Sequence, residues 1–68
     1  MTEQQIKRVK ETWEPVSKEP LVISEIKGTI YAFGSELAVL RLYHKMKTGR
    51  VDYSYNLASW FYALEMKF

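Results

Sequence analysis

Three side chains that can serve in nucleophilic catalysis occur in the second half of this sequence: Ser35, His44 and Asp52. A serine hydroxyl attacks a substrate when a histidine removes its proton and a carboxylate orients that histidine, so the three groups must be in contact. The nine positions between Ser35 and His44 correspond to about 13 Å along the axis of one helix. The spacing therefore predicts no catalytic triad, and we expect a protein that is not an enzyme.

A second chemical signal is the segment Tyr31-Ala32-Phe33-Gly34-Ser35. It resembles the turn from strand to helix in nucleotidyltransferases, which implies a nucleotide substrate and a magnesium site. Such enzymes need two acids two residues apart, because paired carboxylates hold Mg²⁺ against the nucleotide phosphates. Here the next acid after Glu36 is Asp52, and Ser54 stands two positions beyond it. We therefore expect no metal ion and no cofactor, and interpret the segment as a turn into a helix that Ser35 caps.

Composition excludes several other classes. The chain has 68 residues and no cysteine, so it cannot form a disulfide or a thiolate metal site. Its apolar runs are far shorter than the ~20 residues that cross a bilayer, and the first residues lack the basic-then-apolar order of a signal peptide. We expect a cytoplasmic protein with no membrane partner.

Residues 1–68 are expected to form one α+β domain in the order helix, strand, strand, helix, strand, strand. Residues 1–14 are predicted to hold a helix from about Glu3 to Trp13 with a narrow apolar stripe. Residues 15–20 contain two prolines and predict a tether, and residues 21–68 form the compact core. The β-branched and aromatic residues of 21–33 predict two strands, joined by a hairpin turn at Lys27-Gly28 that pairs Ile26 with Thr29 and Val22 with Phe33.

A second helix is predicted between Ser35 as its N-cap and Gly49 as its left-handed C-cap. Helical periodicity gives it one broad apolar stripe that we expect to be core. This stripe contains Ala38, Val39, Leu42, Tyr43 and Met46. Leu37 and Leu40 fall outside the stripe, so they are expected to stay partly exposed unless the first helix or another chain covers them.

The last third of the sequence allows two interpretations. Tyr53 and Tyr55 alternate with polar residues, and a second alternating run from Trp60 to Phe68 follows a turn at residues 56–59, which predicts a β-hairpin. The same residues 57–68 also have a helical stripe and strong helix formers. We prefer the hairpin, because bulky aromatic residues suit a strand. The result is a mainly antiparallel sheet with the central helix packed on one face.

The favoured function is a small protein-interaction module, with self-association as one form of it. Accessory and regulatory proteins of phages and mobile elements often have this size and role. Apolar side chains that the predicted elements leave outside the core are the candidates for partner contact. They are Trp13, Leu37, Leu40 and Phe61.

The alternative is a weak nucleic-acid-binding protein. No acid lies between Glu36 and Asp52, which leaves a local basic patch at the end of the second helix. Its cations would contact phosphates: Arg41, His44, Lys45, Lys47 and Arg50. Exposed aromatic rings on a sheet would stack on unpaired bases: Tyr31, Tyr53, Tyr55 and Tyr62.

Overall fold

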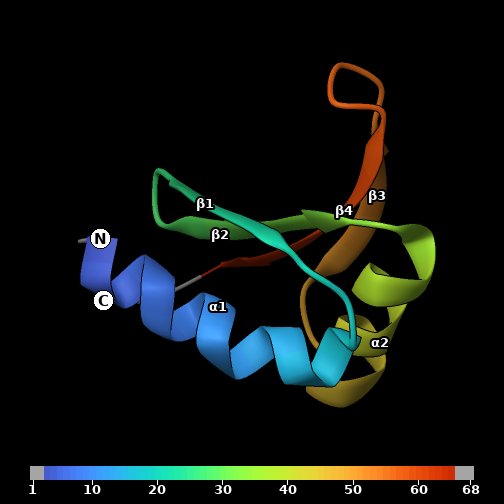
Figure 1. Cartoon of the computed structure of the whole chain (residues 1–68). Helices are drawn as coiled ribbons and strands as arrows, with labels where there is room; N and C mark the ends of the chain where they lie inside the picture. Colours follow the sequence, from blue (N-terminus) through green and yellow to red (C-terminus); the bar gives the residue numbers. More distant parts are fainter. Residues whose placement is uncertain (1–2, 66–68) are drawn as a thin grey trace.

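The computed structural model describes residues 3–65, which form two helices and one four-stranded antiparallel sheet (Figure 1). The sheet order is β1-β2-β4-β3, so two hairpins lie side by side through the central strands β2 and β4. The predicted α+β class, element order and antiparallel sheet are confirmed. The elements are α1 (Glu3–Ser17), β1 (Val22–Ile26), β2 (Thr29–Gly34), α2 (Glu36–Met46), β3 (Arg50–Ser54) and β4 (Ser59–Glu65).

The first hairpin has the predicted turn. Lys27 and Gly28 both have positive φ, 51° and 82°, as in the tight turns whose twist matches that of the flanking strands. The Glu25 carboxylate accepts a hydrogen bond from the Gly28 amide at 3.0 Å. The turn sets Ile26 opposite Thr29, and this confirms the predicted register.

The second hairpin is also confirmed. β3 pairs with β4, and residues 55–58 form the turn between them. The helical interpretation of residues 57–68 is wrong for 59–65, because β4 is a central strand whose backbone pairs with β2 on one side and β3 on the other. The end of that segment, residues 66–68, lies outside the described residues.

The predicted tether at residues 15–20 begins too early, because α1 continues through Pro15 to Ser17. Trp13 and Ser17 are buried at the end of this helix, and Val16 packs against the core. The Ser17 hydroxyl lies within hydrogen-bonding distance of the Glu14 carbonyl at 3.1 Å and of the Glu19 carbonyl at 2.7 Å. This packing outweighs the helix hydrogen bond that proline cannot donate.

The second helix begins as predicted and ends differently. The Ser35 hydroxyl accepts a hydrogen bond from the Ala38 amide at 3.1 Å. The left-handed C-cap is Lys47 (φ 57°), whose amide donates to the Tyr43 carbonyl at 2.7 Å. Gly49, which was predicted as the C-cap, also has a positive φ of 81°, but it has a different role. An added Cβ would collide with the Ala63 carbonyl oxygen, so the glycine lets the chain pass close to β4.

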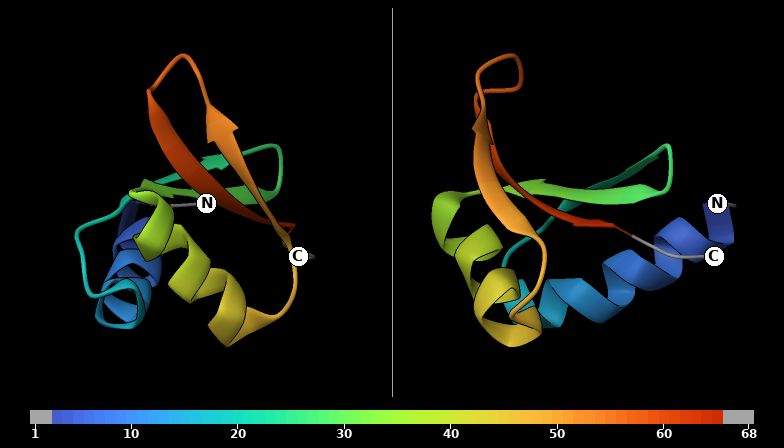
Figure 2. Two further views of the ribbon diagram at one scale, coloured as in Figure 1. Left: turned by 90° about the vertical axis from the view of Figure 1, so that its right-hand side faces the viewer. Right: turned by 180° about the vertical axis from the view of Figure 1, so that it is seen from behind.

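Both helices lie on the same face of the sheet (Figure 2). The core forms between them and this face, and we call it the covered face. Its buried cluster consists of Trp13, Leu21, Ile30, Ala32, Ala38, Val39, Leu42 and Tyr62. The prediction is wrong for Tyr43 and Met46, which are 39% and 36% exposed, because the last turns of α2 slope away from the sheet (Figure 2).

Candidate functional site

The other face of the sheet is covered by none of the helices within residues 3–65 (Figures 1 and 2). Since side chains alternate between the two faces of a strand, the register fixes which residues share this face. They form rows across the strands, in the order β1, β2, β4, β3. The first row is Val22, Phe33, Phe61 and Asp52; the second is Ser24, Tyr31, Ala63 and Arg50; the third is Ile26, Thr29 and Glu65. We call this surface the open face.

An aromatic cluster occupies the centre of the open face. Tyr31 and Phe33 stack with ring centroids 6.1 Å apart, and the Phe61 ring lies 5.6 Å from Tyr31 and 5.7 Å from Phe33. All three residues are half-buried. At the β1 edge, Val22 and Ile26 are 67% and 54% exposed. An apolar band therefore extends from the β1 edge to β4.

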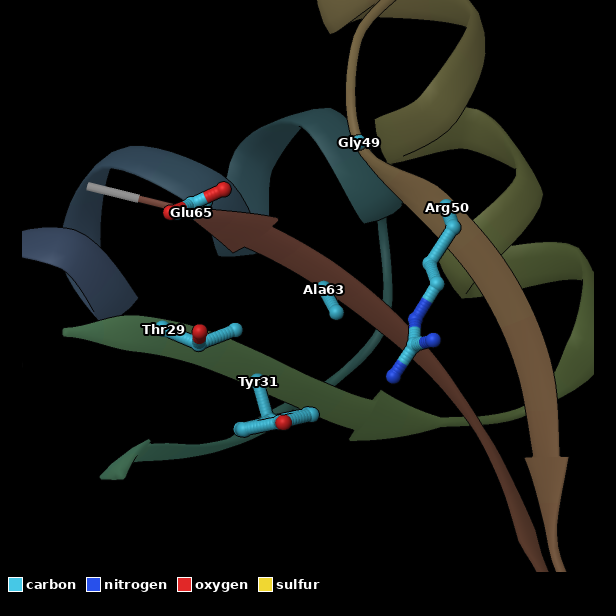
Figure 3. A pocket seen from close by; sticks show the side chains of 6 residues that line it. All are labelled: Thr29, Tyr31, Gly49, Arg50, Ala63 and Glu65. Atoms are coloured by element: carbon cyan, nitrogen blue, oxygen red, sulfur yellow. The ribbon is translucent and has the colours of Figure 1, made fainter. Parts of the chain in front are cut away.

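A shallow cavity of about 320 Å³ lies beside this cluster. Its floor is Ala63, the small residue between Tyr31 on β2 and Arg50 on β3. Figure 3 shows the Tyr31 ring on one side of Ala63 and the Arg50 side chain on the other. The remaining lining residues are Thr29, Gly49 and Glu65. A small side chain flanked by large ones makes this a natural place for a group inserted from outside.

The open face carries charges of both signs along its β3 and β4 margin. Arg50 lies in the second row, between Asp52 in the first and Glu65 in the third. Its guanidinium carbon is 6.0 Å from the Phe61 ring centroid. In the part of the chain that the structure describes, no carboxylate lies within 4.0 Å of the Arg50 guanidinium. The Asp52 carboxylate accepts a hydrogen bond from the Tyr53 amide at 2.8 Å.

The predicted partner-contact residues are not brought together. Phe61 lies on the open face, whereas Leu37 is 54% exposed in the first turn of α2 on the covered side. Leu40 is half-buried. Trp13, predicted to contact a partner, is only 7% exposed and packs edge-on against Tyr62, with centroids 5.7 Å apart. Because α1 lies across the sheet and turns this side chain inward, little of it is accessible to a partner in this fold.

The predicted phosphate-contact residues are also dispersed. The Arg41 guanidinium donates to the Ser17 carbonyl at 2.8 Å and lies 3.7 Å from the Glu19 carboxylate. Arg41 therefore ties α2 to the end of α1. His44, Lys45 and Lys47 are exposed at the end of α2, and Arg50 lies on the open face.

The four tyrosines predicted to stack on bases occupy three different environments. Tyr31 is on the open face, and Tyr53 packs against Tyr55 at 5.0 Å, near the β3–β4 turn. Tyr55 is 89% exposed, but Tyr62 is completely buried, which excludes it from contact with bases in this fold. Its hydroxyl donates to the Thr48 carbonyl at 2.6 Å. Burial raises the pKa of Tyr62 above its usual value of 10.0, although the hydrogen bond opposes this shift.

Several residues of the open face were not among the predicted site residues, namely Val22, Ile26, Phe33, Ala63, Asp52 and Glu65. The signal that could have found them is the parity of each strand, since the first predicted hairpin already placed Val22 opposite Phe33. Applying this alternation to both hairpins would have assembled the rows.

Comparison of the chain with protein-family models, curated proteins and solved structures gives no match. Among residues 3–65, no helix is long and apolar enough to cross a membrane. That range also contains no group of three or more His, Asp or Glu side chains placed to hold a metal ion.

Proposed function

We propose that this protein is a protein-interaction module whose docking surface is the open face of the sheet. The observation that supports this most is the continuous apolar band from Val22 and Ile26 to the aromatic cluster of Tyr31, Phe33 and Phe61. Contiguous exposed apolar surface is typical of protein contact sites, and aromatic residues are enriched at their centres.

The charge distribution favours a protein partner over a nucleic acid. Binding to phosphates requires an excess of cations on the contact surface. In the rows of the open face the Arg50 cation is flanked by two carboxylates, Asp52 and Glu65. Lys45 and Lys47 belong to the end of α2 on the covered side of the sheet. The aromatic cluster and the basic helix end therefore do not form one surface.

The module is proposed to be non-catalytic and to act in the cytoplasm, as an accessory or regulatory protein. The dispersal of the nucleophilic candidates supports the first part. The Ser35 hydroxyl is 3.0 Å from the Glu19 carboxylate and caps α2 at its start. His44 lies in the last turn of that helix, and Asp52 lies on the open face.

Position-specific photo-crosslinking in living cells tests this proposal. A photoreactive phenylalanine derivative replaces Phe33 in one variant and the exposed α1 residue Lys10 in the control. We expect a protein adduct from position 33 and none from position 10, whether the partner is a second copy or another chain. Equal protein yields from both positions, adducts with nucleic acid alone, or no adduct at either position would contradict the proposal.

A further inference from the structure

We infer that the partner on the open face is a second copy of this chain, packed sheet against sheet around a two-fold axis. This inference rests on the proposed function, because it names the occupant of the same surface. Its basis is the register of the rows, which makes the open face complementary to itself.

In the complementary arrangement, the two-fold axis lies in the interface, midway between the first row and the second row. The axis is parallel to the rows and therefore perpendicular to the strands. In an isologous contact, residue i of one copy meets residue j of the other, and j meets i. This axis places the first row of each copy on the second row of the other. Phe33 then faces Tyr31 of the second copy, and Val22 faces Ser24.

The centre of this arrangement matches a large side chain to a cavity. Phe61 in the first row faces Ala63 in the second row of the other copy. Ala63 is the floor of the cavity of about 320 Å³ that Tyr31 and Arg50 flank (Figure 3). Each copy therefore inserts one ring into the other, and the contact interdigitates as interfaces of high packing density do.

The margin of the arrangement matches charges. Asp52 in the first row faces Arg50 in the second row of the other copy, and the reverse pair lies beside it. Glu65 in the third row falls opposite Ser59, which shares its face of β4 just beyond the first row. No carboxylate of these rows therefore faces another carboxylate. A nucleic acid would instead place its anionic phosphates against Asp52 and Glu65.

The shape of the sheet supports the same axis. The β3–β4 hairpin rises steeply from the plane of β1 and β2 (Figures 1 and 2), so the sheet is strongly twisted. A twisted sheet is a saddle, and a two-fold rotation about an in-plane axis perpendicular to the strands maps that saddle onto itself. The two sheets then fit along their length, with the strands of one copy antiparallel to those of the other, within the range of aligned sheet packing.

The size of the face predicts a weak dimer. Four strands about 4.8 Å apart, each with about five residues of about 3.3 Å, give a projected face of roughly 300 Å². Side-chain relief increases the accessible area, so the two copies together bury on the order of 1,000 Å², at the lower limit for a specific interface. We expect monomer and dimer in equilibrium at micromolar concentrations.

Sedimentation equilibrium of the purified chain and its charge-reversal variants tests the inference. In a dimer of Arg50→Asp chains, the new acid at position 50 of each copy faces the native Asp52 of the other. In a dimer of Asp52→Arg chains, the new cation at position 52 faces the native Arg50. Each single variant should raise the dimer dissociation constant about tenfold or more, the range measured for close charge pairs at interfaces. The matched controls Lys10→Asp and Glu11→Arg on exposed α1 should leave it within about twofold.

Mixing the two single variants gives the decisive readout. The native Asp52 of the Arg50→Asp chain then meets the native Arg50 of the Asp52→Arg chain. The two substituted side chains, one at position 50 and one at position 52, also face each other with opposite charges. A mixed dimer should therefore form at concentrations at which each variant alone is still monomeric.

Circular dichroism checks that both variants fold. A wild type that stays monomeric, a mixture that stays monomeric, or controls that weaken the dimer equally would overturn the inference.

A monomeric wild type that still forms a protein adduct from position 33 in cells would overturn the second copy as the partner but leave the docking surface intact. Binding of an oligonucleotide by the wild type that Arg50→Asp abolishes, with no dimer at any concentration, would overturn both proposals.

Discussion

The two faces of this sheet carry aromatic side chains in very different surroundings. On the covered face, Tyr62 is fully buried, its ring touches Trp13 and its hydroxyl donates to the Thr48 carbonyl. On the open face, Phe33 and Phe61 touch each other and Tyr31 but remain half-exposed. The side chains of the covered face make their contacts within the chain. The open face retains exposed apolar surface and charges that a partner can contact. Substitutions on the first should therefore affect folding, and substitutions on the second should affect association.

The largest contrast is expected between Trp13→Ala and Phe33→Ala. Removing a buried tryptophan should reduce the free energy of unfolding by about 3 to 5 kcal/mol, because the cavity beside Tyr62 cannot close. Removing half-buried Phe33 should reduce it by about 1 to 2 kcal/mol in dilute, monomeric solution. Urea denaturation measures both values, and equal losses would contradict the distinction between the faces.

The next largest effect on stability is expected for Gly49→Ala. Gly49 has φ 81°, and an added Cβ would collide with the Ala63 carbonyl and lie 3.0 Å from the Tyr62 hydroxyl. Because the strand geometry near Ala63 would have to shift, the free energy of unfolding should fall by about 2 to 3 kcal/mol. Thermal denaturation checks this, and Lys47→Ala at the neighbouring left-handed C-cap (φ 57°) is the comparison, which lacks the collision and should lose less.

Tyr62→Phe should have a smaller effect, with a distinctive pH dependence. Losing the hydrogen bond to Thr48 should cost about 1 kcal/mol at neutral pH. Burial holds the pKa of Tyr62 above 10.0 in the folded chain, so the hydroxyl ionises first in the unfolded chain as the pH rises. This group's contribution to stability is therefore present below pH 10.0 and is lost above it.

The Tyr62→Phe variant has no hydroxyl to ionise at this position, so it does not lose this contribution to stability at alkaline pH. The difference in stability between the wild type and Tyr62→Phe should shrink as the pH rises past 10.0. Urea denaturation at a series of pH values measures it, and a difference that stays constant or grows would contradict the account of Tyr62.

Val22→Thr is expected to have the smallest effect on folding. Val22 is 67% exposed on the edge strand, and threonine keeps the β-branched shape, so the free energy of unfolding should change by less than about 0.5 kcal/mol. Because Val22 ends the apolar band, the dimer should still weaken measurably in sedimentation equilibrium. A stability loss above about 1.5 kcal/mol would place Val22 in the monomer core instead.

Local sequence signals predicted most of the fold. Ser35 caps its helix, and Lys27-Gly28 makes the turn that sets the first register, because each depends on a few neighbouring residues. The sequence did not predict that α1 ends at Ser17 or that Lys47 is the C-cap of α2. Pro15 and Gly49 are strong local signals for the end of a helix, and tertiary packing overrides both. Pro15 is tolerated where Trp13 and Ser17 are buried, and Gly49 serves the close approach to β4.

The candidate site was harder to predict from the sequence than the fold. Whether an aromatic residue is buried depends on which face of the sheet the helices cover, and no local sequence pattern shows this. Tyr31 and Tyr62 both lie in strands rich in aromatic residues, yet the structure places Tyr31 on the open face and Tyr62 on the covered face. The role of Ala63 depends on its neighbours across two strands, which only the full register reveals.

The most direct test of the difference between the faces is an amide-resolved NMR dilution series of the wild-type chain. We predict that concentration-dependent shifts are confined to β2, β4 and the neighbouring edge strands, with the largest at Phe33, Phe61 and Ala63, and that α1 and α2 stay unchanged. Spectra that do not depend on concentration, or shifts that map to the helices, would contradict the account of the open face as the docking surface for a second copy.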